Sequence, residues 1–271
     1  MKQQINNAIY IGKLFLGLAL ILTIVTSCTE KKPAETSNKL NLKFSHKVDN
    51  NNLIFNEMIY TNAAGNNYEV TEVMYFISDL KLHHSDGRTI QPAQWDDIHY
   101  IDTNIPSTFD WIVGTDIPTG LYDSLTFTFG FSQARNQSFM FVNPPEVNMA
   151  WPEVLGGGFH YLMLNGWWKD LQEVRRPFNF HMGIGQTYAN NSGQVSDITG
   201  FVHNNFTVRP AGEKFRIEEN KENVINLVMH IESWFDTPLI YDHNTWGGAI
   251  MQNQEAMHIA AINGRDAFSI E

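Results

Sequence analysis

The stretch Leu40-Asn41-Leu42-Lys43-Phe44-Ser45-His46 alternates apolar and polar side chains, and it predicts the fold of the chain. Successive side chains of a β-strand point to opposite faces, so Leu42, Phe44 and His46 share one face. The stretch Leu125-Thr126-Phe127-Thr128-Phe129 repeats this pattern with its odd positions. Further strands are predicted at 73–83, 99–102, 159–165, 178–181, 201–208 and 224–231, separated by turn-rich pieces.

Helix is scarce in this sequence. Aromatic residues make up 13% of the chain and charged residues only 17%, a balance that favours sheets over charged helices. One helix is predicted from Ala249 to Ile262, where Asn263-Gly264 supplies a stop signal. The sequence therefore predicts an all-β protein, a two-sheet β-sandwich with long loops and a short C-terminal helix.

The N-terminus is typical of a bacterial lipoprotein precursor. Residues 1–27 contain two lysines, no acidic residue and an apolar run from Leu14 to Val25, which is the layout of a signal peptide. Small residues precede Cys28, so we expect cleavage before this cysteine and lipidation of its sulfur. Residues 28–39 are polar and are predicted to form a tether, and residues 40–271 the folded domain. We expect a protein held by lipid at the cell envelope, on its periplasmic face or at the cell surface.

Charge and cysteine content exclude several classes of function. Removal of residues 1–27 lowers the Lys and Arg count from 18 to 16 against 29 Asp and Glu, a formal charge of −13. Because such a surface repels phosphate backbones, no nucleic-acid partner is expected. Cys28 is the single cysteine, which excludes an intramolecular disulfide, a Cys-rich zinc site and a thiol nucleophile in the domain.

The candidate site residues are histidines and one unusual loop. The sequence has ten histidines and ten methionines, and imidazole and thioether groups both bind copper. His46 lies on the apolar face of its strand. His181 lies in the same predicted strand as Phe178 and Phe180, on the opposite face. Taken singly, each is more typical of a structural or surface histidine. The loop Met149-Ala150-Trp151-Pro152 precedes three glycines, which indicates tight backbone packing around a core or rim tryptophan.

The order of these motifs resembles the MbnP-like family, periplasmic copper-binding partners of a di-haem oxidase that are related to copper-scavenging surface proteins of methane oxidisers. The resemblance spans most of the domain. It rests on the opening strand 42–46, the stretch 68–82, Phe129-Gly130 with Arg135-Asn136, the loop 148–151, and Phe180-His181-Met182-Gly183.

The resemblance implies a copper site in which histidine imidazoles act together with a tryptophan oxidised to kynurenine. Carried over to this chain, it implies His46 and His181 as imidazole ligands and Trp151 as the oxidised residue. Met182, Met149 and His160 are possible further donors, each more typical of packing. It also implies a copper carrier, scavenger or substrate of a di-haem peroxidase-like partner, and no enzyme activity of its own. Asn148 and Glu153 depart from the family pattern, which has a glycine and often an aromatic residue there.

Two other functions are compatible with the sequence. Trp167-Trp168 and Trp246 would suit a lipoprotein that binds glycan or peptide by stacking, provided that these rings are exposed and coplanar. A lipid-anchored hydrolase with an Asp/Glu dyad is the third possibility, although the common catalytic motifs are missing from the sequence.

Overall fold

The computed structural model describes residues 38–92, 97–190 and 192–271. The predicted signal peptide, Cys28 and nearly all of the tether lie outside these residues. The described residues form one compact unit. In the described part, no helix is long and apolar enough to cross a membrane.

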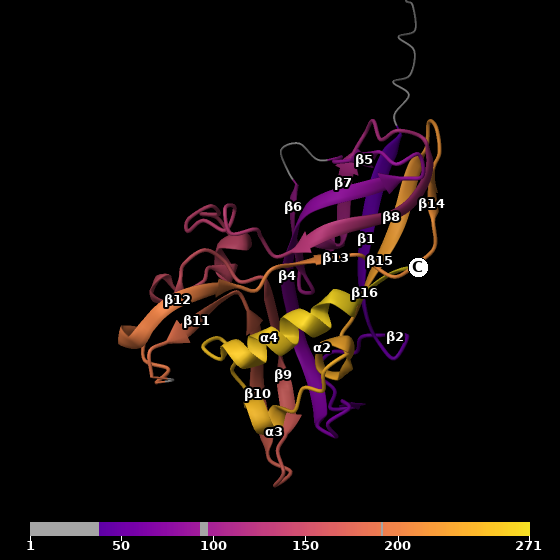
Figure 1. Ribbon diagram of the computed structural model, residues 1–271. Helices are drawn as coiled ribbons and strands as arrows, with labels where there is room; N and C mark the ends of the chain where they lie inside the picture. Colours follow the sequence, from indigo (N-terminus) through magenta and orange to yellow (C-terminus); the bar gives the residue numbers. More distant parts are fainter. Residues whose placement is uncertain (1–37, 93–96, 191) are drawn as a thin grey trace, which may run out of the picture. The chain divides into compact units, whose positions relative to one another are not determined.

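Two large sheets make up most of the unit, as the sequence predicts (Figure 1). The smaller sheet contains five strands: β1 (Lys39–Val48), β2 (Asn51–Asn52), β7 (Asp110–Gly114), β15 (Glu222–His230) and β16 (Phe268–Ile270). Its central strands β1 and β15 run parallel, with His46 paired to Met229. The alternation in 40–46 therefore holds, because Leu40, Leu42 and Phe44 are buried between the layers.

The larger sheet is built around the long strand β4 (Asn67–His84), which pairs with both β9 and β8. Its other strands are β3 (Tyr60–Thr61), β5 (Thr89–Ile90), β6 (Ile98–Asp102), β8 (Gly120–Phe129), β9 (Leu162–Lys169), β10 (Arg175–Met182), β13 (Phe206–Val208) and β14 (Phe215–Ile217). A separate hairpin consists of β11 (Ile184–Tyr188) and β12 (Ile198–His203).

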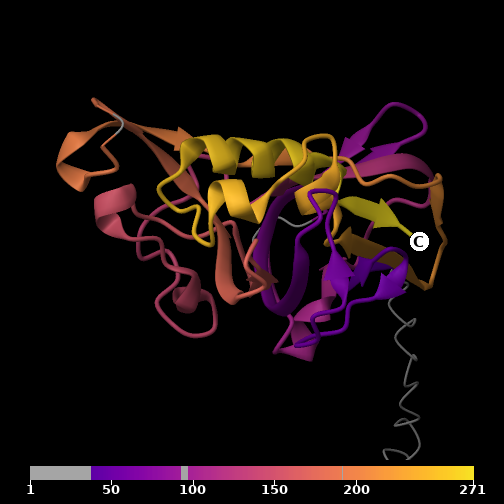
Figure 2. The same cartoon turned by 90° about the horizontal axis from the view of Figure 1, so that it is seen from below.

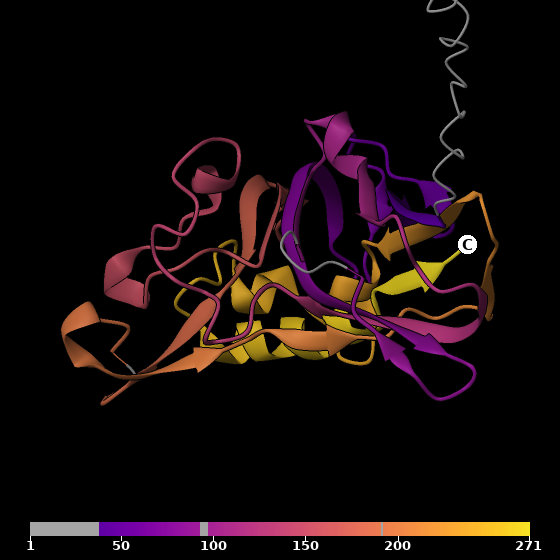
Figure 3. The ribbon, with the colours of Figure 1, turned by 90° about the horizontal axis from the view of Figure 1, so that it is seen from above.

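The helices are α2 (Ser233–Asp236), α3 (His243–Trp246) and α4 (Gln254–Asn263). Single 3-10 turns are η1 (Pro106–Phe109), η2 (Glu146–Met149), η3 (Glu153–Leu155), η4 (Val195–Asp197) and η5 (Gly264–Asp266). Phe180 of β10 packs against Trp234 and Phe235 of α2. Helix α2 therefore lies against the face of β10 that carries Phe180. The loop around η2 and η3 lies on the other side of β9 and β10 (Figures 2 and 3).

Three of the predicted boundaries that differ from the structure have clear local reasons. The strand expected at 159–165 begins at Leu162, because Phe159 bridges to Ala150 instead. The strand expected at 201–208 is split at Asn204, whose amide donates to the Gly183 carbonyl. The helix expected from Ala249 begins at Gln254, because the Asn253 side chain accepts from Ala256 N and caps it there.

Candidate metal centre

His181 lies in β10 on the face of the large sheet that points away from the space between the two sheets. Directly paired residues of neighbouring strands share a face, and Met182 pairs with Leu162, which pairs with Tyr75. These three side chains are fully buried in the core. His181 comes one residue earlier and therefore belongs to the opposite face, as the two flanking phenylalanines predicted.

A second imidazole, that of His160, meets His181 on this face. The two ring centroids are 5.1 Å apart and the rings are nearly perpendicular. His160 is held by the loop that precedes β9, where His160 N donates to Met149 O and Trp151 N donates to Gly158 O. These two bonds tie the ends of the loop together, and consecutive glycines with positive φ, including Gly158 at +78°, make the turn between them.

Hydrogen bonds fix which nitrogen of each ring carries the proton. His160 Nδ1 lies 2.9 Å from the carbonyl oxygen of Met149, which only accepts, so Nδ1–H donates. His181 Nε2 lies 2.7 Å from Oδ1 of Asn165, and the Asn165 amide nitrogen donates to Glu72. This orients the Asn165 amide, so His181 Nε2–H donates to its oxygen. Both rings are thereby held by a second layer of partners, as metal-binding imidazoles are.

The remaining nitrogen of each ring offers a lone pair. Neither His160 Nε2 nor His181 Nδ1 has a hydrogen-bond partner among the described residues, although both atoms are buried. Burial lowers the pKa of His160 to about 4. Burial, and then the charge of His160, lowers the pKa of His181 to about 3. Both rings are neutral at pH 7, the form that binds metal ions.

Trp151 completes this cluster. Its ring lies edge-on to His160 at a centroid distance of 4.6 Å, and it is only 2% exposed. The indole nitrogen donates to Leu155 O, and the six-membered ring packs against Gly183, where a Cβ would lie 2.6 Å from Trp151 Cε3. The predicted association of Trp151 with His181 is therefore present, with His160 between them.

His46 does not join this cluster, and the expectation that it meets His181 is wrong. Its ring packs between the sheets against Tyr75 and Phe109, with centroid distances of 5.7 Å to each. Because Tyr75 lies on the core face of β4, the large sheet separates His46 from His181. The alternating pattern correctly placed His46 on the inward face of its strand. It did not show that His181 occupies the opposite side of the large sheet.

In residues 38–271, leaving aside 93–96 and 191, no group of three or more His, Cys, Asp or Glu side chains is arranged to hold a metal ion. The imidazole pair would therefore need donors of another type. Its closest carboxylate partner by hydrogen bonding, Glu72, acts only through Asn165.

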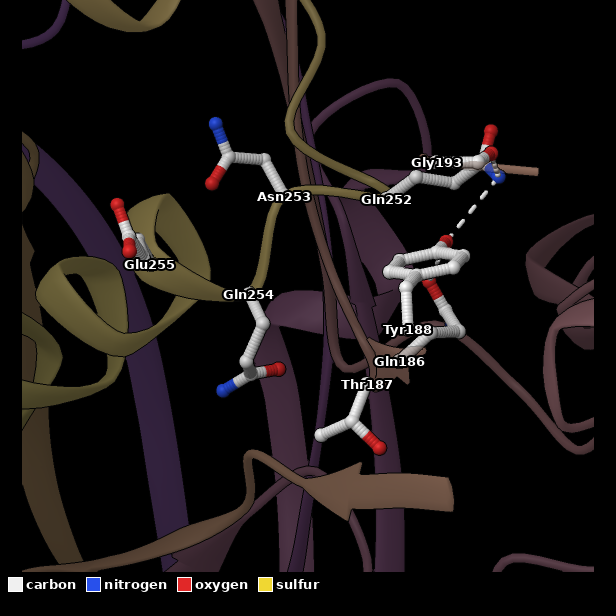
Figure 4. Close-up of a pocket in the computed structure, with 8 residues that line it drawn as sticks. All are labelled: Gln186, Thr187, Tyr188, Gly193, Gln252, Asn253, Gln254 and Glu255. Atoms are coloured by element: carbon white, nitrogen blue, oxygen red, sulfur yellow. Dashed lines mark hydrogen bonds between the residues drawn. The ribbon is translucent and has the colours of Figure 1, made fainter. Parts of the chain in front are cut away.

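A hollow lies elsewhere, between the β11–β12 hairpin and the start of α4 (Figure 4). It has a volume of about 460 Å³ and is lined by amides and hydroxyls, among them Gln252, which donates to the Tyr188 hydroxyl. Gln186 connects it to the tryptophan loop, because its amide donates to the same Leu155 carbonyl as Trp151. This lining does not suit a soft metal, and the imidazole pair is the better candidate for a metal site.

The tryptophans invoked for glycan binding do not form a platform. Trp168 is buried and stacks on His243, whereas Trp167 points to the other face of β9 beneath the Arg175 guanidinium. Consecutive residues of a strand cannot present coplanar rings on one face. The condition set for a stacking surface at this pair is therefore not met.

Sequence reasoning named His160 only as a possible donor and missed Asn165 and Glu72. The three glycines before His160 were the available signal, because they indicated a loop folded closely onto its neighbour. The partners of His181 come from β9 and β4, and only the strand pairing reveals them.

Comparison with known proteins identifies the family. A sequence profile described as MbnP matches residues 37–254. The chain belongs to the MbnP family. Among solved structures, MbnP from Methylosinus trichosporium matches with a TM-score of 0.54 and 13% sequence identity, covering 86% of this chain and 98% of that one. At this identity the likeness shows a shared fold. Among curated proteins, none matches the sequence significantly.

Proposed function

We propose that this MbnP-family protein binds copper through His160 Nε2 and His181 Nδ1, as a non-catalytic carrier or scavenger. The supporting observation is the pair of buried, neutral imidazoles, each anchored through one nitrogen and unpartnered among the described residues at the other. A buried polar atom without a partner is costly, and a metal ion would satisfy both atoms at once. Nitrogen donors of this kind suit copper.

The test is a copper titration of the domain and of His160→Ala, His181→Ala and His46→Ala, each first shown to be folded. Mutation of a residue that only orients a metal ligand weakens metal binding roughly 10- to 100-fold. Loss of either proposed ligand itself is expected to weaken copper binding by more than this. His46→Ala is the matched control, because it removes an equally buried imidazole from the other side of the sheet. Equal loss in all three variants would contradict the assignment.

We further propose that Trp151 is converted to kynurenine by a di-haem peroxidase-like partner that supplies the oxidant. Its position beside His160 supports this, because a ring amine there would join the imidazole pair as a nitrogen donor. Two equivalents of peroxide would cleave the indole C2–C3 bond and add two oxygen atoms, with release of two waters. Hydrolysis of the resulting N-formyl group would then release formate and leave kynurenine, a net gain of about four mass units. Peptide mass spectrometry of protein from its native host should find this gain at Trp151 and not at Trp234, which is equally buried.

We propose lipid attachment through Cys28 as the route to the cell envelope. The apolar run followed by Cys28 supports this proposal, and two or more acyl chains hold a protein firmly on a membrane. Cys28→Ser should move the protein from the membrane fraction to the soluble fraction. Persistence of the variant in washed membranes would contradict lipid anchoring at this residue.

A further inference from the structure

A row of soft donors crosses three strands beside the imidazole pair. Met163 of β9 pairs directly with His181 of β10 on one side and with Met74 of β4 on the other. Directly paired residues share a face, and their Cβ atoms lie about 5 Å apart. Met74, Met163 and His181 are therefore neighbours on the face that carries the metal centre. Met163 is partly buried and Met74 is buried.

The charge of this face favours a monovalent ion. An imidazole binds a metal ion in its uncharged form, a thioether carries no charge, and Glu72 reaches His181 only through the Asn165 amide. Neutral donors in a low-dielectric environment do not neutralise the charge of a bound ion. The free-energy cost of burying the ion therefore rises steeply with its charge. A divalent cation such as Zn²⁺ is penalised far more than Cu(I) at such a site.

We propose that the Met163 thioether is a further ligand of this centre and makes it selective for Cu(I). Met74, its cross-strand neighbour on β4, would be an alternative thioether ligand. This inference rests on the proposed function of the imidazole pair. Thioethers select Cu(I) over harder ions, and methionine has three rotatable bonds with which to reach an ion beside its cross-strand neighbour. The donor set is then two nitrogens and one sulfur, all uncharged.

The sequence offers a matched control in Met182. This residue follows His181 directly, but its side chain lies on the core face of the sheet and is fully buried. The test compares Met163→Leu with Met182→Leu, because leucine keeps the volume and removes the sulfur. Cu(I) affinity is measured by competition with a chromogenic Cu(I) chelator, and Zn²⁺ affinity is measured in parallel.

Met163→Leu should weaken Cu(I) binding by about tenfold or more and leave Zn²⁺ binding unchanged, whereas Met182→Leu should change neither. A second measurement needs no variant: Ag(I), a redox-silent substitute for Cu(I), should shift the methyl NMR signal of Met163 and not that of Met182.

Unchanged Cu(I) binding by Met163→Leu, together with a stationary Met163 methyl signal, would overturn thioether ligation. If His160→Ala and His181→Ala still lost copper in that case, the proposed function would stand without Met163. Tighter binding of Zn²⁺ than of Cu(I) by the unmodified protein would overturn the selectivity. Absence of any copper binding would remove the proposed function and this inference together.

Discussion

At the scale of single residues, the candidate centre depends on how each imidazole is oriented. Met149 O and the Asn165 side chain each accept one ring N–H, which leaves the other nitrogen of His160 and of His181 without a partner among the described residues. The same two residues would be ordinary buried histidines if their protons sat on the other nitrogens. Second-layer acceptors therefore distinguish a metal-binding pair from a packing pair.

Asn165→Leu tests this dependence. It removes the acceptor of His181 Nε2–H, so the ring loses its fixed tautomer and orientation, and copper affinity should fall about 10- to 100-fold. Asn179→Leu is the control, because Asn179 pairs directly with Asn165 on β10 and shares its face without bonding to either imidazole in the described structure. Equal affinities of Asn165→Leu and the unmodified protein would contradict an orienting role.

The depressed pKa values predict how the rings respond to acid. With pKa values of about 4 for His160 and about 3 for His181, neither ring gains a proton between pH 7.5 and 5 in the folded protein. Their ring C–H NMR signals should therefore stay constant across this range, and protons should not compete with copper there. A titration midpoint near 6.5 for either ring would show that it is solvated rather than buried.

At the scale of elements, period-two alternation predicted several of the longer strands and the face that side chains take within them, but not strands such as β7 and β11. It placed His181 opposite Phe178 and Phe180 correctly. It carried no information about which faces of β1 and β10 meet across the layers, so the convergence of His46 with His181 failed. That relation is set by long-range pairing through β4 and β9, which a single sequence does not encode locally.

The glycine turn before His160 is the element on which the centre depends. Gly158 has a φ of +78°, and a Cβ at this position would lie 2.5 Å from Oδ1 of Asn136. Gly158→Ala should destabilise the protein by about 1–3 kcal/mol through backbone strain, with a further cost from this contact. It should also displace Trp151, whose backbone nitrogen bonds to Gly158 O.

Gly65→Ala separates the two effects, because Gly65 has a φ of +82° with open space around its missing Cβ. Urea unfolding should show a larger loss of stability for Gly158→Ala than for Gly65→Ala. Copper affinity should fall only in the Gly158 variant. Equal losses in both variants would mean that backbone strain alone is responsible and that the loop tolerates displacement.

At the scale of the whole molecule, the described core contains several histidines that are neutral because they are buried. Burial lowers the pKa of His46, His99 and His243 to about 4, as it does for His160, and that of His181 to about 3. In the unfolded chain each ring takes up a proton near pH 6.5. Between pH 6.5 and 4 the unfolded state thus binds more protons, and stability falls as the pH falls.

Each ring contributes at most about 1.4 kcal/mol per pH unit in this window. The free energy of unfolding, measured in urea at pH 7.5, 6.5 and 5.5, should therefore be greatest at pH 7.5 and drop by several kcal/mol at pH 5.5. His243→Phe should make this dependence shallower, because phenylalanine suits a position stacked on Trp168 and Phe178 and does not titrate. An unchanged slope in His243→Phe would contradict the burial of this ring.

The central claim, that His160 and His181 face a common ion through specific nitrogens, is tested most directly by ¹⁵N NMR of the imidazoles during Cu(I) addition. Large shifts are expected at His160 Nε2 and His181 Nδ1, with the protons on His160 Nδ1 and His181 Nε2 retained and the His46 signals unchanged. Shifts at the opposite nitrogens, or at His46 in place of His160, would contradict it.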